Sequence, residues 1–158
     1  MTIQFVQGDA TAPAGDGTKM IVHVCNDVGK WGKGFVLAVS RRWKEPERLY
    51  KASFKAPSPP ALGDVQFVPV EPLVIVANLI GQHGIATRAS KTPPVRYEAI
   101  AAGLAKVAEH ALAIGASVHM PRIGCGLAGG DWSMIEPIIA KTLIQSGVAV
   151  TVYDFAED

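Results

Sequence analysis

Six short apolar runs, separated by longer amphipathic segments, constrain the fold of this chain more than any other feature. The runs are rich in β-branched residues and are bounded by Gly, Pro or Asp, which is the pattern of β-strands. Several are almost continuously apolar, as strands buried on both faces are. The predicted strands cover residues 3–6, 20–24, 65–70, 73–78, 116–120 and 148–153.

Three helices are predicted between and after these strands. They cover about residues 34–44, with a continuation after residue 46, then about residues 96–114, and a segment that starts near residue 133. Gly115 is a natural stop for the second helix, in which apolar residues recur at helical spacing. In the third helix, Ser133 and Glu136 have the spacing of a capping box, and Pro137 is expected in the first turn, where backbone N–H groups lack helical partners.

The order of these elements predicts the class of fold. Strands 65–70 and 73–78 are adjacent and are expected to form a hairpin through Glu71 and Pro72, whereas the other strands alternate with helices. Alternation of this kind produces parallel strands with helices on both faces of the sheet. We therefore predict a single domain over residues 1–158, an α/β fold built as a three-layer α/β/α sandwich with a central mixed, mostly parallel sheet of about six strands.

Charge and composition exclude several classes of protein. The formal net charge of +1 argues against a nucleic-acid partner bound by bulk electrostatics, and no apolar run reaches the roughly 20 residues of a membrane span. No signal peptide is visible, and no cluster of His, Cys and acidic residues has metal-ligand spacing. We expect a cytoplasmic protein with no metal, no cofactor and no membrane partner. Its oligomeric state stays open, with a monomer as the simplest expectation.

A glycine-rich run, Gly124-Cys-Gly-Leu-Ala-Gly-Gly130, follows the fifth predicted strand and precedes the last helix. Glycines allow the backbone to approach a ligand and turn its N–H groups inward, and the helix adds its positive N-terminal end. The spacing matches the dinucleotide fingerprint, but only one helix and one strand follow, which disfavours a dehydrogenase. We interpret the run as a cradle for a diphosphate, with a tight structural turn as the alternative.

The segment after the second predicted strand follows the same logic. Asn26 and Asp27 come directly after the strand, and a loop rich in glycine then leads into the helix that begins at about Gly34. In open α/β sheets, ligands bind at the carboxyl ends of the strands. Two loops of this kind in one small domain predict the two walls of a single cleft.

These motifs together resemble the macrodomains, a family that binds ADP-ribose. Val6-Gln-Gly-Asp-Ala-Thr11 is similar to the family's Gly-Asp-Ile-Thr motif, the loop from Asn26 to Gly34 is similar to its ribose-binding loop, and residues 120–132 are similar to its phosphate loop. The resemblance covers nearly the whole chain in the same order. It is closest to the branch that contains the terminal ADP-ribose protein glycohydrolase and its bacterial relatives. It implies the macrodomain fold, ADP-ribose as ligand and ADP-ribosylated protein as partner.

The resemblance also implies roles for single residues. Asp9 would accept a hydrogen bond from the adenine amino group, and Phe155 or, alternatively, Tyr153 would pack against the adenine ring. The two glycine loops would contact the distal ribose and the diphosphate. The ligand-binding residues expected in this way are Asp9, Ala10, Asn26, Trp31, Gly32, Lys33, Gly34, Phe35, Val36, Ile123, Gly124, Cys125, Gly126, Leu127, Ala128 and Phe155.

The sequence departs from this branch at the catalytic positions. Where the branch has an attacking lysine after Leu-Ile-Thr, this chain has Leu79-Ile-Gly81 followed by Gln82. Where the branch has an aspartate after Gly-Cys-Gly-Leu, this chain has Ala128, and Asp131 comes three residues later. Glutamine cannot form a Schiff base, so hydrolysis would have to use an activated water. The catalytic candidates are Asn26, Gln82 and His83.

Several single residues have both a structural and a functional interpretation. His23, inside a strand, fits a packed, hydrogen-bonded core histidine better than a base, whereas His83 fits either a general base or a surface histidine. Trp31 either covers the ribose or packs, and Lys33 either neutralises a phosphate or points to solvent. Cys125, close to a helix N-terminus, is expected to have a lowered pKa, although no arginine follows it at phosphatase spacing.

Three functions are compatible with these motifs. The leading one is an ADP-ribosyl hydrolase that acts on glutamate or aspartate esters in proteins, because an ester leaving group needs little acid assistance. The second is a binding module that reads ADP-ribose without chemistry, which the missing lysine and Ala128 favour. The third is a phosphatase that acts on ADP-ribose 1''-phosphate.

Overall fold

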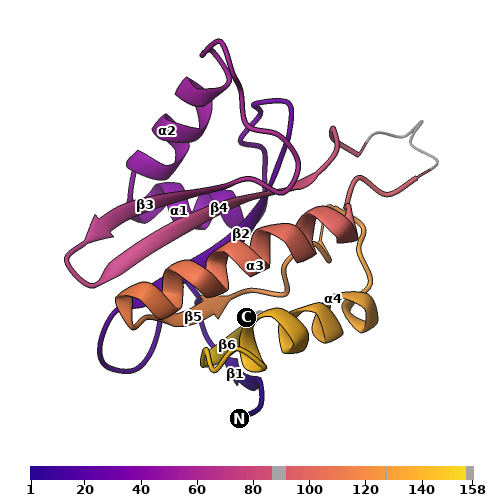
Figure 1. Ribbon diagram of the computed structural model, residues 1–158. Coiled ribbons are helices and arrows are strands. Elements are labelled where there is room, and N and C mark those ends of the chain that lie inside the picture. Colours follow the sequence, from indigo (N-terminus) through magenta and orange to yellow (C-terminus); the bar gives the residue numbers. More distant parts are fainter. Residues whose placement is uncertain (87–91, 127, 156–158) are drawn as a thin grey trace.

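A six-stranded sheet covered by helices on both faces forms the centre of the molecule in the computed structural model, which describes residues 1–86, 92–126 and 128–155 (Figure 1). This architecture confirms the predicted fold class. The elements in chain order are β1 (Gln4–Gln7), β2 (Lys19–Asn26), α1 (Phe35–Arg42), α2 (Glu45–Ser53), β3 (Val65–Glu71), β4 (Val74–Gln82), α3 (Tyr97–Ile114), β5 (Ser117–Met120), α4 (Trp132–Ile139), the π-helical segment η1 (Ala140–Ile144) and β6 (Val150–Asp154).

The strands lie in the order β1-β6-β5-β2-β4-β3. Only β3 is antiparallel to its neighbour β4, where Glu71 pairs with Val74, so the predicted hairpin is confirmed. All other pairs are parallel. The carboxyl ends of β1, β6, β5, β2 and β4 therefore meet at one edge of the sheet, and the loops that follow these strands are gathered there.

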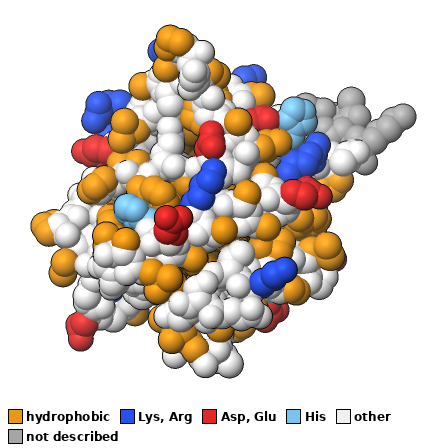
Figure 2. All heavy atoms as spheres, viewed as in Figure 1, with side chains coloured by type: hydrophobic (Ala, Val, Ile, Leu, Met, Phe, Trp, Pro, Cys, Tyr) orange, Lys and Arg blue, Asp and Glu red, His pale blue; other side chains and the backbone are white. Residues whose placement is uncertain are grey.

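Alternating side chains of the central strands supply two separate cores. In β2, Met20 and Val22 belong to the core beneath α3 and α4, whereas Ile21 and Cys25 belong to the core beneath α1 and α2. This alternation is the two-residue period of a strand buried on both faces. Figure 2 views the face covered by α3 and α4, where acidic and basic side chains are interspersed, as the small net charge implies.

The start of α4 differs from its prediction. The N-cap is Asp131, whose Oδ1 accepts hydrogen bonds from the Ser133 backbone N–H (2.9 Å) and hydroxyl (2.8 Å), so Ser133 does not cap the helix. A carboxylate is favoured here because it satisfies a free N–H and interacts with the positive end of the helix. Because α4 begins at Trp132, Pro137 lies inside the helix and beyond the first turn, and the π-helical segment follows.

Gly103 marks the closest contact between α3 and the sheet. A Cβ built on Gly103 would lie 2.5 Å from Cγ of Leu79, which is fully buried in β4. Alanine would improve helix propensity by about 1 kcal/mol, but overpacking of a filled core costs about 1–3 kcal/mol. The close approach of α3 to β4 therefore depends on the missing side chain.

We predict that Gly103→Ala lowers the free energy of unfolding by up to about 2 kcal/mol, because an overpacking cost of about 1–3 kcal/mol exceeds a propensity gain of about 1 kcal/mol. Urea denaturation measures the change. Ala105→Gly, at an exposed position of the same helix, is the control and should lose only about 1 kcal/mol of propensity. A Gly103→Ala protein more stable than the wild type would show that α3 has room to move away from β4.

Candidate functional site

A cleft lies at the sheet edge where the carboxyl ends of the parallel strands meet. It consists of two adjoining cavities of about 440 and 460 Å³. The first, which we call the phosphate-loop cavity, is lined by Gly124, Gly126 and Ala128 among others. The second, the distal cavity, is lined by residues such as Asn26 and Lys30. The two cavities share Val24, Lys33, Val36 and Gln82.

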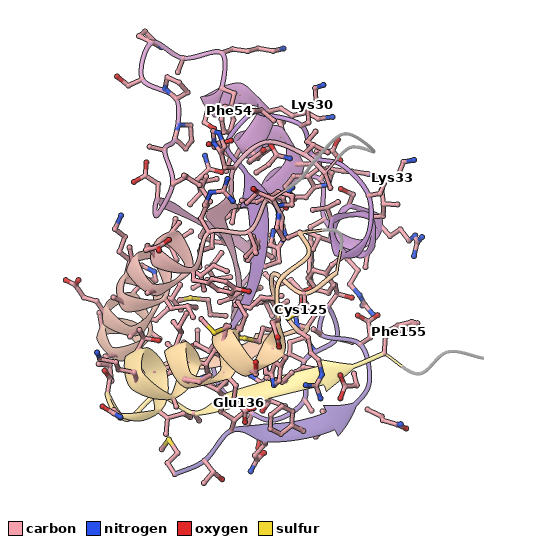
Figure 3. All side chains as sticks on the ribbon, turned by 90° about the vertical axis from the view of Figure 1, so that its right-hand side faces the viewer. Lys30, Lys33, Phe54, Cys125, Glu136 and Phe155 are labelled. Atoms are coloured by element: carbon pink, nitrogen blue, oxygen red, sulfur yellow. The ribbon has the colours of Figure 1, made fainter. Side chains whose placement is uncertain are left out.

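The two glycine loops form opposite walls of this cleft, as their positions after β2 and β5 predicted. Gly34, from the loop after β2, and Gly126, from the loop after β5, line the same cavity. Figure 3 shows Lys33 and Cys125 on one face of the molecule, each on its own loop. Segments about 90 residues apart in sequence are brought together because β2 lies directly beside β5 in the sheet.

Hydrogen bonds within its own backbone close the phosphate loop. The Gly130 N–H donates to the Gly124 carbonyl (2.7 Å), and the Gly129 N–H donates to the Gly126 carbonyl (3.0 Å). A Cβ on Gly130 would collide with the Gly124 oxygen, so this closure requires glycine. A Cβ on Gly126 would meet nothing within 4 Å. Gly126 is therefore a position where the loop opens to the cleft.

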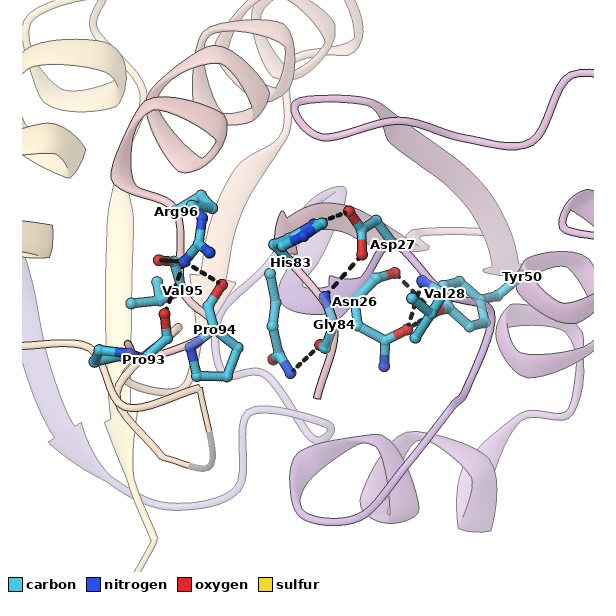
Figure 4. A network of polar contacts seen from close by, with 11 residues as sticks. Asn26, Asp27, Val28, Tyr50, His83, Gly84, Pro93, Pro94, Val95 and Arg96 are labelled. Atoms are coloured by element: carbon cyan, nitrogen blue, oxygen red, sulfur yellow. Dashed lines mark hydrogen bonds and ion pairs between the residues drawn. The ribbon is translucent and has the colours of Figure 1, made fainter. Parts of the chain in front are cut away.

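Asn26 holds the other wall in shape. Its buried Oδ1 accepts hydrogen bonds from the N–H groups of Val28 (3.1 Å) and Lys30 (3.3 Å) and from the Tyr50 hydroxyl (2.6 Å), and its Nδ2 donates to the Lys30 carbonyl (Figure 4). Most of the hydrogen-bonding capacity of the Asn26 side chain is thus used to hold the conformation of the loop. One N–H of Nδ2 is left to face the distal cavity, which the residue lines.

A β-bulge decides which side chain of the β4 end enters the cleft. Cys25 pairs with Ile80, but Asn26 pairs with Gln82, so Gly81 is an extra residue. Gln82 lines both cavities, and its Nε2 donates to the Gly84 carbonyl (2.9 Å). Its Oε1 has no hydrogen-bond partner among the residues that the structure describes. Of the catalytic candidates, Gln82 is the one that lines both cavities.

His83 lies elsewhere, with its side chain 62% exposed and outside both cavity linings. Its Nδ1 is 2.8 Å from Oδ2 of Asp27, a residue to which the sequence alone assigned no role. Asp27 also accepts a hydrogen bond from the Gly84 N–H (2.8 Å), and its own N–H donates to the Gln82 carbonyl (3.0 Å). The Asp27 carboxylate therefore fastens the loop after β2 to the loop after β4 (Figure 4).

The pKa of Asp27 is lowered even though the carboxylate is partly buried. Burial by itself would raise the pKa, but the hydrogen bond from Gly84 and the contacts with His83 together outweigh it. The ionised form is therefore favoured in the folded protein. This preference makes the connection between the two loops dependent on pH.

His23, which lines the cleft, and Cys125, which lies beside it, are both uncharged. Burial lowers the pKa of His23 to about 4, although its Nε2 makes a 2.6 Å hydrogen bond with Oδ1 of Asn78 that acts in the opposite direction. His23 is thus the core histidine that the sequence favoured, with one side on the phosphate-loop cavity. Burial also raises the pKa of Cys125, despite Arg122 nearby, so the expected lowering is wrong. Cys125 does not line the cleft.

Trp31 is mainly a packing residue. It is buried, and its Nε1–H is shared between the Ser40 hydroxyl (2.8 Å) and the Val36 carbonyl (3.1 Å), with one side of the residue on the distal cavity. Lys33 is exposed and lines both cavities. Neither cavity lining contains an aspartate or glutamate among the described residues, while Lys30 and Lys33 are cationic and the charge of Arg122 is paired with Asp154. This balance suits an anionic ligand.

The residues expected at adenine lie beyond the cavity linings, at the ends of β1 and β6. Oδ1 of Asp9 accepts hydrogen bonds from the N–H (2.8 Å) and hydroxyl (2.7 Å) of Thr11, while Oδ2 lies 3.8 Å from Nη2 of Arg42 in an ion pair. Phe155 is 73% exposed, whereas Tyr153 is buried, so Phe155 is the aromatic residue that is open to a base. The pairing of β1 with β6 places Asp9 and Phe155 at neighbouring strand ends.

The predicted ligand-binding residues divide into three groups. One lines the cleft and comprises Asn26, Trp31, Gly32, Lys33, Gly34, Phe35, Val36, Ile123, Gly124, Gly126 and Ala128. Another lies outside the linings and comprises Asp9, Ala10, Cys125 and Phe155. Leu127 lies outside the described residues. Within the described part of the chain, no helix is long and apolar enough to cross a membrane, and no group of three metal-binding side chains gathers.

Comparison with known proteins identifies the family. A macrodomain protein from Streptomyces coelicolor is 57% identical and superposes with a TM-score of 0.85, covering 98% of this chain and 99% of that one. The chain belongs to the macrodomain family. A Bacteroides thetaiotaomicron protein of unknown function is 55% identical with a TM-score of 0.94, and 98% of each chain is covered. No family model matches the chain.

A further relative is similar to this chain over one part of a larger protein. Mouse chromodomain-helicase-DNA-binding protein 1-like is 32% identical over 163 residues, which cover 98% of this chain. The match takes up 18% of the mouse protein, and only 15% of its zebrafish counterpart. This chain therefore spans less than a fifth of the length of either relative, and the similarity concerns the macrodomain alone.

We predict that Asp27→Asn destabilises the protein near pH 7 by about 1–2 kcal/mol, because hydrogen bonds to an ionised group are lost. The lowered folded-state pKa means that this contribution is complete above the unfolded value of about 3.9 and is lost as the pH falls through the folded value. The difference between variant and wild type should therefore shrink at about pH 3.

Urea denaturation at both pH values measures this difference. Asp16→Asn, at an exposed position in the loop before β2, is the control and should change stability at neither pH. An equal loss at both pH values for Asp27→Asn would show that the carboxylate charge is not what fastens the two loops.

Proposed function

We propose that this macrodomain binds ADP-ribose in the cleft. The observation that carries the proposal is the convergence of two glycine loops on one groove whose described lining residues include lysines and no acid. Backbone N–H groups beside a helix N-terminus suit a diphosphate. Thermosipho africanus DarTG, solved in complex with ADP-ribose, shares the fold with a TM-score of 0.69 and 18% identity over 88% of this chain and 38% of that one.

The order of residues along the sheet edge suggests how the ligand lies. The diphosphate occupies the phosphate-loop cavity between Gly126 and Lys33. The adenine extends towards Asp9 and Phe155 at the ends of β1 and β6, and the distal ribose enters the distal cavity beside Asn26. The strand order supports this arrangement, because β6, β5 and β2 are consecutive neighbours in the sheet.

We further propose that the protein hydrolyses ADP-ribosyl esters of glutamate or aspartate side chains. Water attacks the anomeric carbon of the distal ribose, a new bond forms to the water oxygen, and the bond to the ester oxygen breaks. The carboxylate leaves with the bonding pair, and the water proton passes to a ligand phosphate oxygen or to solvent. Oε1 of Gln82, which accepts no hydrogen bond from the described residues, would orient the water between the cavities.

A macrodomain that only reads ADP-ribose is the second candidate, and specific contacts favour it. Asn26 makes most of its hydrogen bonds with its own loop and with Tyr50. His83 contacts Asp27 outside the cleft. Gln82 can orient a water but cannot accept its proton at neutral pH. Binding of ADP-ribose would then require only the two glycine loops, whereas hydrolysis would depend on how precisely Gln82 positions a water.

For binding, we predict that Gly126→Glu weakens ADP-ribose affinity by roughly 100-fold, because bulk and negative charge enter the diphosphate site. The space around Gly126 is open, so the variant should keep the wild-type melting temperature. Isothermal titration calorimetry measures the affinity. Ala105→Glu, on the exposed side of α3, is the charge-matched control. If Gly126→Glu binds ADP-ribose as tightly as the wild type, the diphosphate does not bind at this loop.

For hydrolysis, we predict that the wild type releases ADP-ribose from a glutamate-ADP-ribosylated protein, and that Gln82→Met slows release roughly ten- to hundredfold without changing ADP-ribose affinity. Methionine keeps the length of the side chain but removes the acceptor. Gln145→Met, at an exposed position after η1, is the control. Tight binding with no release at stoichiometric protein would select the reader instead.

A further inference from the structure

Arg122 connects the phosphate loop to the strand end that carries Phe155. It follows β5 and lines the phosphate-loop cavity. Its Nε and Nη2 donate to the two carboxylate oxygens of Asp154, at 2.7 and 3.0 Å. Asp154 is the last residue of β6, and Phe155 comes next. The paired contact fixes both distance and orientation, which a single point contact does not.

Two aromatic rings hold the guanidinium of Arg122 from other elements. Its Cζ lies 5.2 Å from the ring centre of Phe5 in β1 and 5.0 Å from that of Trp132 at the start of α4. The two rings themselves meet edge to face, with centres 6.2 Å apart. Arg122 thus joins four segments: β1, the phosphate loop, α4 and β6. We call Arg122, Asp154, Phe5 and Trp132 the arginine clamp.

The exposure of the ion pair indicates that stability alone does not explain the clamp. The side chains of Arg122 and Asp154 are 38% and 43% exposed, and exposed ion pairs contribute little to folding. What the clamp does control is geometry, because Phe155 is 73% exposed and its position depends on the end of β6. Figure 3 shows Phe155 beyond the end of this strand, on the same face as Cys125 of the phosphate loop.

We propose that Arg122 is a positioning residue for base recognition: through Asp154 it holds Phe155 at a set distance from the phosphate loop, and so selects ligands that carry a purine on their diphosphate. The inference rests on the proposed binding of ADP-ribose. It adds that affinity for the base and affinity for the phosphates are separable and are connected through the Arg122–Asp154 pair. The Arg122–Asp154 pair should therefore not increase the affinity of a ligand that has no base.

The test compares ADP-ribose with ribose 5-phosphate, which lacks the whole adenosine and one of the two phosphates, by calorimetric titration of each into the protein. Arg122→Met and Asp154→Asn should each weaken ADP-ribose about tenfold, the size of one lost base–aromatic contact, and ribose 5-phosphate less than twofold. Arg122→Lys should fail to rescue, because it keeps the charge and loses the paired contact. Arg48→Met, exposed on α2, is the matched control and should change neither affinity.

A double-mutant cycle distinguishes positioning from a general structural effect. Once Phe155→Ala has removed the ring, adding Arg122→Met should cause no further loss of ADP-ribose affinity. Additive losses, or equal losses for both ligands, would overturn the inference and place the effect of Arg122 in the phosphate loop. Unchanged ADP-ribose affinity in Arg122→Met would overturn it as well. A wild type that binds neither ligand would instead refute the proposed function, and this inference with it.

Discussion

The parallel pairing of β2 with β5 on one side and β4 on the other is the constraint on which the rest of this molecule depends. Parallel neighbours end at the same edge, so the loops that follow them are forced together there. The loop after β2, the phosphate loop after β5 and Gln82 at the end of β4 become neighbours for this reason alone. Two cores, one on each face of the sheet, hold the three strands in register.

Within that frame, glycines set the distances that a ligand site requires. Gly130 lets the phosphate loop close on the Gly124 carbonyl, and Gly103 lets α3 lie directly on Leu79. At Gly126 the missing side chain serves another purpose, because the space there opens to the cleft and is not filled by protein. The same residue type thus makes close packing in two places and an opening in the third. Sequence alone does not distinguish these uses, because the neighbours of each glycine come from remote segments.

The strand pattern, the hairpin and the two-loop cleft were predictable because they depend on local alternation and chain order. The cap of α4 was predicted wrongly, since Asp131 accepts the N–H of Ser133 itself, which places Ser133 in the first turn, and a carboxylate is favoured at that end of the helix. The locations of Gln82 and His83 could not be predicted either. The bulge at Gly81 shifts the register by one residue, and such a shift reverses the face on which every following side chain lies.

By itself, the sequence determined the class of fold, the order of the strands along the chain and the two glycine loops. These features follow from the periodicity of apolar residues and from the backbone freedom of glycine. Only the tertiary structure decided which polar side chains face the cleft. Asn26 was assigned to the ligand and serves chiefly its own loop, Asp27 had no assigned role and joins two loops, and Arg122 joins the phosphate loop to β6. Hydrogen-bond partners of this kind lie up to 57 residues apart in sequence. Their pairing is set by strand order and register, which no local pattern encodes.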